Sequence, residues 1–175
     1  MLIPSKLKIA LLSTLITLSA PAYSADELND STIMAIFDQA NTVDIWIARI
    51  GSMKGQSTEV KQLAQMVMTD HQLVQQMGRD LAKAEGLAIT PPHNDGSAQD
   101  LADTIALLQS KEGEEFDKAY LKREIAFHKG VINAIDSTLL PSIKNPEFKA
   151  LVKKVLPGFK HHLQATQNAA QKLGY

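Results

Sequence analysis

The chain has 175 residues, with 18 basic side chains, 19 acidic side chains and no cysteine. This length suits one domain. The interspersed charges argue against nucleic-acid binding, which needs a concentrated positive surface. The lack of cysteine excludes disulfides, thiol catalysis and thiolate metal sites.

The first residues have the order of a secretory signal peptide. Lys6 and Lys8 precede an apolar stretch over residues 9–18, and small side chains follow at Ala22 and Ser24. The apolar stretch is about ten residues long, whereas a membrane-spanning helix needs roughly 20. We therefore predict a signal peptide over residues 1–24 and one exported domain over residues 25–175. The predicted location is the periplasm, with secretion as the alternative and no membrane span in the mature protein.

The first two predicted helices cover residues 31–54 and 57–85. Asp30 or Ser31 can accept the free backbone amides at the start of the first helix, and Ser57 can do so for the second. Gly86 is expected to end the second helix. Apolar residues recur at helical spacing in the first helix at Ile33, Ile36, Phe37, Ala40, Val43, Ile47 and Ile50.

The rest of the chain is predicted to hold a loop, a short helix and two further long helices. Residues 87–96 contain Pro91, Pro92 and Gly96 and indicate a loop. A short helix then begins at Ser97. A long helix follows from residue 114 and ends at Pro141. Residues 145–147 (Asn-Pro-Glu) are a strong start for the last helix, which continues to residue 173.

The predicted fold is an all-α bundle of four long helices. No segment alternates with a period of two, so no sheet is expected. The first and last pairs of helices have short turns, but about 25 residues connect the second helix with the third. A single long crossover of this kind is typical of the ferritin-like four-helix bundle, here with a short extra helix in the crossover. An up-down-up-down bundle is the alternative.

Three histidines interrupt the apolar seams of three different helices. They are His71, His128 and His162, and Asp44 and Glu124 offer carboxylates on the first and third long helices. In the ferritin-like arrangement, the histidines and Asp44 lie at a similar depth, roughly 15–24 Å from the same end of the bundle. Imidazole with carboxylate suits zinc, copper, iron or nickel, so the sequence predicts one transition-metal ion held by these five residues.

Two other metal chemistries have weaker support in the sequence. Di-iron bundles use Glu-x-x-His on two helices, and this chain has none, because Glu124 and His128 are one residue further apart. Met66 and Met68 would suit Cu(I) beside His71, although methionines at helical spacing more often fill a core. The side chain of Asp70 points about 100° away from that of its neighbour His71, so it is expected to face solvent or a second groove.

The same histidines also fit a protein that binds no metal. They would then be buried polar groups that fix the register of the helices, with Tyr120, Thr166 or the carboxylates as partners. The function would lie on the surface, as in a non-catalytic interaction module of the cell envelope whose protein partner is not identified. An enzyme is a third interpretation, because a catalytic site would use the same residues with an open coordination position.

Three motifs resemble a known family. They are EVKQLAQMVMTDH at residues 59–71, EFDKAYL at residues 115–121 followed by His128, and LPGFKHHL at residues 156–163. Together they are similar to exported bacterial proteins of domain-of-unknown-function family 4142. The resemblance implies a ferritin-like bundle in the cell envelope, in which the family's histidines correspond to His71, His128 and His162. It implies no settled activity, and a role in metal handling or envelope stress is the working hypothesis.

Overall fold

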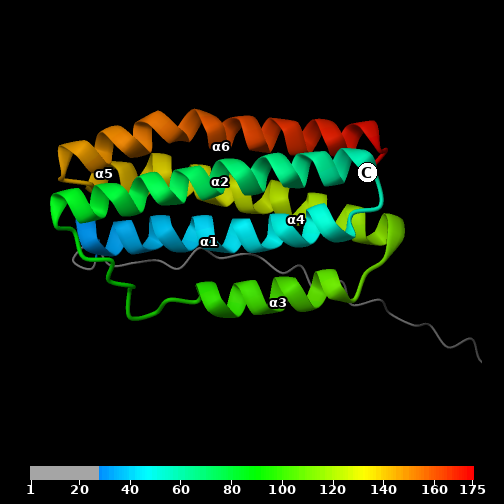
Figure 1. The fold of residues 1–175 in the computed structure, drawn as a ribbon, viewed down its shortest axis with the longest axis horizontal. Helices are drawn as coiled ribbons and strands as arrows, with labels where there is room; N and C mark the ends of the chain where they lie inside the picture. Colours follow the sequence, from blue (N-terminus) through cyan, green and yellow to red (C-terminus); the bar gives the residue numbers. More distant parts are fainter. Residues whose placement is uncertain (1–27) are drawn as a thin grey trace, which may run out of the picture.

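The computed structural model describes residues 28–175 and shows an all-helical protein (Figure 1). The predicted signal peptide, residues 1–24, lies outside these residues. The predicted all-α class is confirmed, and no strand occurs in the described part of the chain. Within residues 28–175, no helix combines the length and apolar character that crossing a membrane requires.

Four long helices dominate the structure, and three short elements connect or extend them. The short elements include a π-helical turn, η1, which follows α4 directly. The elements in chain order are α1 (Asp30–Lys54), α2 (Thr58–Glu85), α3 (Ser97–Gln109), α4 (Gly113–Ala134), η1 (Ile135–Leu139), α5 (Leu140–Ser142) and α6 (Pro146–Lys172).

The start of α1 differs by one residue from the sequence prediction. Asn29, rather than Asp30 or Ser31, caps this helix, because its side-chain oxygen accepts the amide of Thr32 at 3.0 Å. Asn29 has the extended backbone that a cap requires. Asp30 is the first helical residue, and its carboxylate binds the turn before α6 instead.

The other predicted helix boundaries that depend on capping are confirmed. Ser57 accepts the amide of Val60 at the start of α2, and Asn145 accepts the amide of Phe148 at the start of α6. Gly86 ends α2 in the left-handed conformation, with φ of 63°, which glycine adopts without steric cost.

The third long helix was predicted to end at Pro141, and this prediction is wrong. The chain passes from α4 through η1 into α5 and stays helical to Ser142. Pro141 lies in the last turn of this helical stretch, directly after Leu140, whose amide bonds the carbonyl of Ile135 five residues earlier. A π-helical turn is uncommon and frequently accompanies a functional site.

The long helices form two antiparallel pairs. In Figure 1, α1 and α6 run in one direction, whereas α2 and α4 run in the other. The main contacts are between α1 and α2 and between α4 and α6, while α2 also packs against α6 and α1 against α4. The crossover over residues 86–112 carries α3, which lies against α1 and α4.

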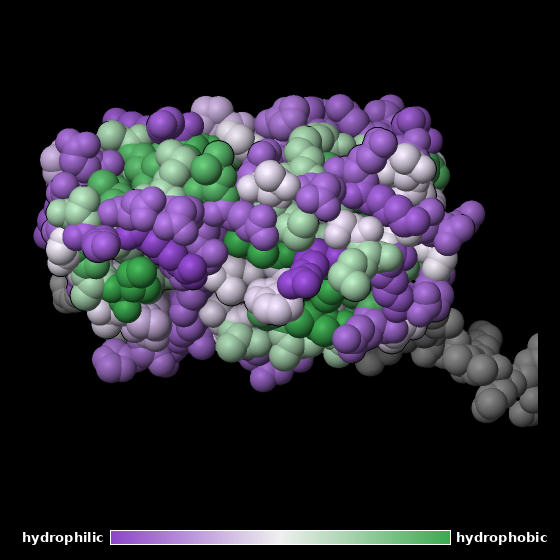
Figure 2. Space-filling model, viewed as in Figure 1, coloured by the Kyte–Doolittle hydropathy of each residue, from purple (hydrophilic) through white to green (hydrophobic). Residues whose placement is uncertain are grey.

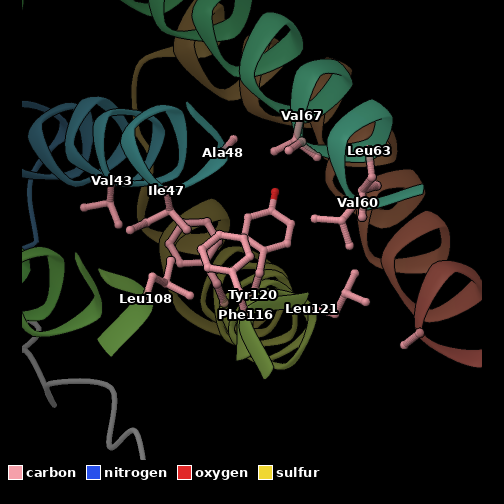
Figure 3. Packing of buried hydrophobic residues seen from close by; sticks show 13 residues of the cluster. Val43, Ile47, Ala48, Val60, Leu63, Val67, Leu108, Phe116, Tyr120 and Leu121 are labelled. Carbon is pink, nitrogen blue, oxygen red and sulfur yellow. The ribbon is translucent and has the colours of Figure 1, made fainter. Parts of the chain in front are cut away.

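Two hydrophobic clusters fill the two halves of the bundle. The first contains Phe116, Tyr120 and Ile47 and lies near the turn between α1 and α2 (Figure 3). The second contains Phe148 and Ile33 and lies near the start of α6. Along α2 and α6, His71 and His162 fall between the stretches that supply these two clusters.

A carboxylate at each end of the bundle ties one helix pair to the turn of the other. In each case both carboxylate oxygens accept backbone amides, which gives a buried or half-buried charge the donors it needs. The contacts, all at 2.8 Å, are Asp117 with the amides of Gln56 and Ser57, and Asp30 with the amides of Lys144 and Asn145.

Candidate metal centre

The structure brings the five predicted site residues together in the middle of the bundle. Asp44 comes from α1, His71 from α2, Glu124 and His128 from α4, and His162 from α6. Each is at most 3% exposed. One potential ligand atom from each of the three histidines lies within 4.8 Å of those from the other two, and the same holds for Asp44, Glu124 and His128.

The three imidazole rings form a nearly equilateral triangle. The ring centroids are 5.7 Å apart for His71 and His128, 5.1 Å for His71 and His162, and 5.4 Å for His128 and His162. Bonds of about 2.0–2.1 Å to one tetrahedral ion would place the nitrogens about 3.4 Å apart. Movements of less than about 1 Å in each side chain are enough to reach that geometry.

The outer nitrogen of each imidazole faces a hydrogen-bond acceptor. The Nδ1 atom of His71 lies 2.9 Å from the amide oxygen of Asn41. The Nδ1 atom of His128 lies 3.0 Å from the backbone carbonyl one turn earlier, and the Nε2 atom of His162 lies 2.9 Å from a carboxylate oxygen of Asp70. Because an acceptor requires a donor opposite it, these contacts assign the ring protons to the outer nitrogens.

The orientation of Asn41 makes the assignment for His71 secure. The amide nitrogen of Asn41 donates to the backbone carbonyl of Phe37 at 2.7 Å. The amide oxygen is therefore the atom that remains for His71, because a rotated amide would place its oxygen against the carbonyl of Phe37 and lose that bond.

The inner nitrogens of neutral imidazoles consequently carry lone pairs, and these lone pairs surround a carboxylate. The Oδ2 atom of Asp44 lies 2.9 Å from Nε2 of His71 and 3.5 Å from Nε2 of His128. The 2.9 Å separation has the length of a hydrogen bond, yet the two groups are not aligned for one, and neither atom has a hydrogen-bond partner. These nitrogens and the carboxylate oxygen are all atoms that can bind a cation, and they converge on one region.

Within residues 28–175, every buried side-chain nitrogen or oxygen that lacks a hydrogen-bond partner belongs to this cluster. Native proteins leave few buried polar atoms unpaired, and a group of them at one point indicates a binding site. The atoms are Asp44 Oδ2, His71 Nε2, His128 Nε2, His162 Nδ1, both carboxylate oxygens of Glu124 and the hydroxyl of Tyr120.

The titration of the cluster favours an ionised Asp44 and neutral side chains of His128 and His162. Burial opposes the charge on Asp44, but His71 and His128 outweigh it and lower the pKa of Asp44 to about 2. Burial lowers the pKa of His128 to about 4, and it also lowers the pKa of His162. Imidazoles must be neutral to bind a metal, so these shifts prepare the site for a cation.

Glu124 lies at the edge of the cluster. Its Oε2 atom is 3.7 Å from Nδ1 of His128, on the outer side of that ring. Burial and the nearby charge of Asp44 raise the pKa of Glu124 well above its usual range. Burial and Asp44 thus favour the protonated form of Glu124, which must lose its proton before it can bind a cation.

Thr166 and Tyr120 were expected to hydrogen-bond the histidine rings in a metal-free network, and neither hydroxyl does so. Thr166 donates its hydroxyl to the backbone carbonyl of His162 at 2.7 Å, and so it does not contact the ring as a donor. The hydroxyl of Tyr120 has no partner, and Figure 3 shows it directed away from the neighbouring ring of Phe116. Burial and the charges of Glu124 and Asp44 raise the pKa of Tyr120 well above 10.

The sequence did not identify Asn41 as a contact of His71, and it did not predict that Asp70 contacts His162. Asp70 was expected to face solvent or a second groove, and its side chain is 51% exposed while it also binds His162. Asn41 gave a signal in the sequence, since it lies one turn before Asp44 on the same face of α1. Met66 and Met68 pack against the hydrophobic cluster around Phe116, as core methionines do.

A groove leads from the surface to the candidate metal centre. It has a volume of about 320 Å³ and lies between α2 and α6, with His71 and His162 in its lining. Asp70 and Lys154 are also part of the lining, and the other walls are mostly apolar. Figure 2 shows apolar surface along the boundary between α2 and α6, in the half of the molecule where α6 begins.

Comparison with known proteins gives a family but no activity. No curated protein matches the chain, and no solved structure matches it. One family does match, described as a domain of unknown function (DUF4142), over residues 17–169. The match extends over most of the 175 residues and contains His71, His128 and His162 together with both carboxylates of the cluster. The chain therefore belongs to the DUF4142 family.

Proposed function

We propose that this protein binds one divalent transition-metal ion in the middle of the bundle and serves in metal handling. The ligands are an inner nitrogen from each of His71, His128 and His162 and a carboxylate oxygen of Asp44. Glu124 lies next to them and can replace or supplement Asp44 when it is ionised.

The observation that carries the proposal is the fixed orientation of the three imidazoles. Histidines that bind a metal almost always donate their other ring N–H to a carboxylate or carbonyl. Here Asp70, Asn41 and a backbone carbonyl accept those protons. All three lone pairs are thereby directed to the one region that also holds an ionised carboxylate.

The donor set favours a single ion of the zinc type. Three imidazoles and one carboxylate complete a tetrahedral shell for Zn²⁺, and the same set suits Fe²⁺, Ni²⁺ or Cu²⁺. Two ions would need bridging carboxylates, and only Asp44 and Glu124 occur in the buried cluster.

The proposed fold type is the ferritin-like bundle, and the proposed location is the periplasm. The fold type is supported by two antiparallel helix pairs joined by one long crossover. The location is supported only by the signal-peptide pattern of residues 1–24. Metal handling in the envelope, including its response to metal stress, is the role that we propose for this combination.

A metal-free polar network explains the geometry less well. Such a network stabilises a fold when its members bond one another, and a partly satisfied network is costly. In this cluster the inner atoms face acceptors rather than donors, so the network is complete on its outer side and incomplete on its inner side.

The test is metal binding by the purified protein. After treatment with a chelator and dialysis, the protein is titrated with Zn²⁺ and with Co²⁺, whose visible spectrum reports four-coordinate nitrogen and oxygen ligands. We expect one ion per chain in the wild-type protein and none in the variant in which His71, His128 and His162 are all alanine.

The matched control removes two histidines outside the cluster. His93 lies in the loop before α3, and His161 lies on the outer face of α6, and both are exposed. The double variant His93→Ala with His161→Ala should bind one ion as the wild type does. Absence of binding by the wild-type protein, or binding that only the control variant abolishes, would contradict the proposal.

A further inference from the structure

A second hollow lies beside the candidate metal centre, and it is lined by α1, α4 and η1 rather than by α2. It has a volume of about 70 Å³ and lies between α1 and the segment formed by α4 and η1. Ile36 and Ala40 of α1 face Val131 of α4 and Leu139 of η1 across it, and residues of α6 contribute to its wall. This apolar cavity shares Phe159 with the groove.

The wall of the apolar cavity offers no group that could hold water. Asn41 is its one lining residue with a polar side chain, and both polar atoms of that side chain are already bonded, to His71 and to the carbonyl of Phe37. A buried water needs two to four polar partners, whereas a cavity lined by aliphatic and aromatic groups stays dry and accepts apolar guests. The cavity is about half the size of an engineered cavity of ~150 Å³ that binds benzene or xenon. A diatomic gas therefore fits it, and an aromatic molecule does not.

The inner wall of the cavity consists of residues that hold a proposed metal ligand in place. Asn41 accepts the ring proton of His71, and the ring of Phe159 packs edge-on against that imidazole at 4.9 Å between centroids. A guest in the cavity is thus separated from the metal centre by one layer of side chains.

The π-helical turn forms another part of the wall. Ile135 and Leu139 of η1 both line the cavity, and Ala134, the last residue of α4, lies beside them. A π-helical turn inserts an extra residue into a helix and is frequently found at functional sites. In this protein two of its residues line the cavity, which connects an unusual backbone feature with the hollow.

We propose that the apolar cavity is a binding site for a small apolar molecule of the size of a diatomic gas, such as dioxygen, next to the metal centre. The link to the metal rests on the proposed function, whereas the cavity's occupancy by a gas does not. The gas would then be held one layer of side chains away from the metal, whereas the α2–α6 groove reaches two of its ligands, His71 and His162.

Xenon is the probe for the cavity itself. Methyl resonances of the metal-free wild-type protein are followed by NMR under increasing xenon pressure. We expect saturable shifts confined to the methyl groups of Val131, Ile135, Leu139 and their neighbours in the cavity. Ala134→Leu should fill the cavity and reduce these shifts at least fivefold.

The control is Ala165→Leu, which enlarges another partly buried alanine. Ala165 packs against the hydrophobic cluster around Phe116, in the other half of the bundle, and is not part of the cavity. This variant should keep the xenon response of the wild type. Absence of saturable shifts in the wild type, or equal loss of the shifts in both variants, overturns the proposal.

The link to the metal is tested by the relaxation of bound ¹²⁹Xe. The protein is loaded with paramagnetic Co²⁺ or with diamagnetic Zn²⁺, and elemental analysis establishes one ion per chain. Xenon within the cavity should relax at least twofold faster beside Co²⁺. Equal relaxation with one ion bound overturns the link to the metal. Failure of either ion to bind contradicts the proposed function, while the xenon shifts of the metal-free protein still decide whether the cavity holds a gas.

Discussion

Two buried carboxylates, one at the end of the bundle and one in its middle, have opposite surroundings. Asp117 and Asp44 are both 1% exposed. Both oxygens of Asp117 accept backbone amides at 2.8 Å in the turn between α1 and α2. The Oδ2 atom of Asp44 instead faces imidazole nitrogens of His71 and His128 without an aligned hydrogen bond.

The charge of Asp117 therefore stabilises the fold, whereas the charge of Asp44 is available to bind a cation. A buried carboxylate that finds its donors within the chain ties two parts of the fold together. A buried carboxylate whose oxygen has no aligned hydrogen-bond donor keeps that oxygen available for a cation. The two regions should therefore respond differently to metal, to pH and to mutation.

The largest difference should appear when metal is added. Free Zn²⁺ at 1,000 times its dissociation constant should raise the free energy of unfolding by about 4 kcal/mol, because the ion binds the folded state. Asp44→Asn keeps the size of the side chain but removes its charge, and it should lose most of this increment. Asp117→Asn should retain it. The measurement is urea unfolding in the presence of Zn²⁺ and in the presence of a chelator, and an equal increment in both variants would contradict the comparison.

Acid should weaken the middle of the bundle before it affects the end. Unfolded histidine binds a proton near pH 6.5, whereas burial lowers the pKa of His128 to about 4 in the folded protein. The unfolded state therefore binds more protons between these values, and stability falls as the pH falls from 6.5 to 4. The difference of about 2.5 pH units corresponds to a loss of roughly 3 kcal/mol. The contribution of Asp44, whose pKa is about 2, is lost only at lower pH.

The pH experiment requires a variant of Glu124. Burial raises the pKa of this carboxyl, so its titration acts in the opposite direction over part of the same range. Glu124→Gln removes that effect, and urea unfolding of the metal-free variant between pH 7 and pH 4 should show the full decrease. Replacement of His128 by phenylalanine in the same background should reduce the slope and leave the contribution of His162, whose pKa burial also lowers. A curve that keeps its slope after that replacement would show that another group titrates.

The third effect tests the end of the bundle alone. Asp117→Ala leaves two backbone amides without their acceptor and should lower the free energy of unfolding by about 2 kcal/mol. The control is Asp136→Ala, which removes a half-exposed ion pair with Lys160 and should cost less than about 0.5 kcal/mol. The affinity of both variants for Zn²⁺ should stay within twofold of the wild type. A large loss of metal affinity in Asp117→Ala would mean that the two regions are coupled.

The parts that sequence could predict are those that depend on periodicity. Apolar spacing gave the long helices, and the interruption of three seams by histidine indicated which residues would meet. Three polar residues in three apolar seams give a signal that does not depend on the exact rotation of each helix. The spacing could not show which ring nitrogen of His71 faces inward. That depends on the contact with Asn41, which lies on the neighbouring helix α1.

The features that sequence could not predict depend on contacts between distant residues. Asp30 and Asn29 are both good caps, and the choice between them follows from the turn before α6, which takes up the Asp30 carboxylate more than 100 residues away. Asp70 points away from the seam of α2, and only the packing of α6 on that side places His162 within its reach. The π-helical turn arises near Pro141, where the local sequence predicts an end.

The smallest effect tests whether the outer contacts of the histidines tune the metal. Asp70→Asn keeps an acceptor for the ring proton of His162 but removes the negative charge that makes the imidazole more basic. We expect the affinity for Zn²⁺ to fall about tenfold, which corresponds to about 1.4 kcal/mol, with one ion still bound per chain. Asp80→Asn changes another exposed aspartate on α2, bonded only to Gln76, and should leave the affinity unchanged. Competition with a chelating indicator resolves this difference. If Asp70→Asn has the affinity of the wild type, the carboxylate does not act through His162, and the contact belongs with the structural charges such as Asp117.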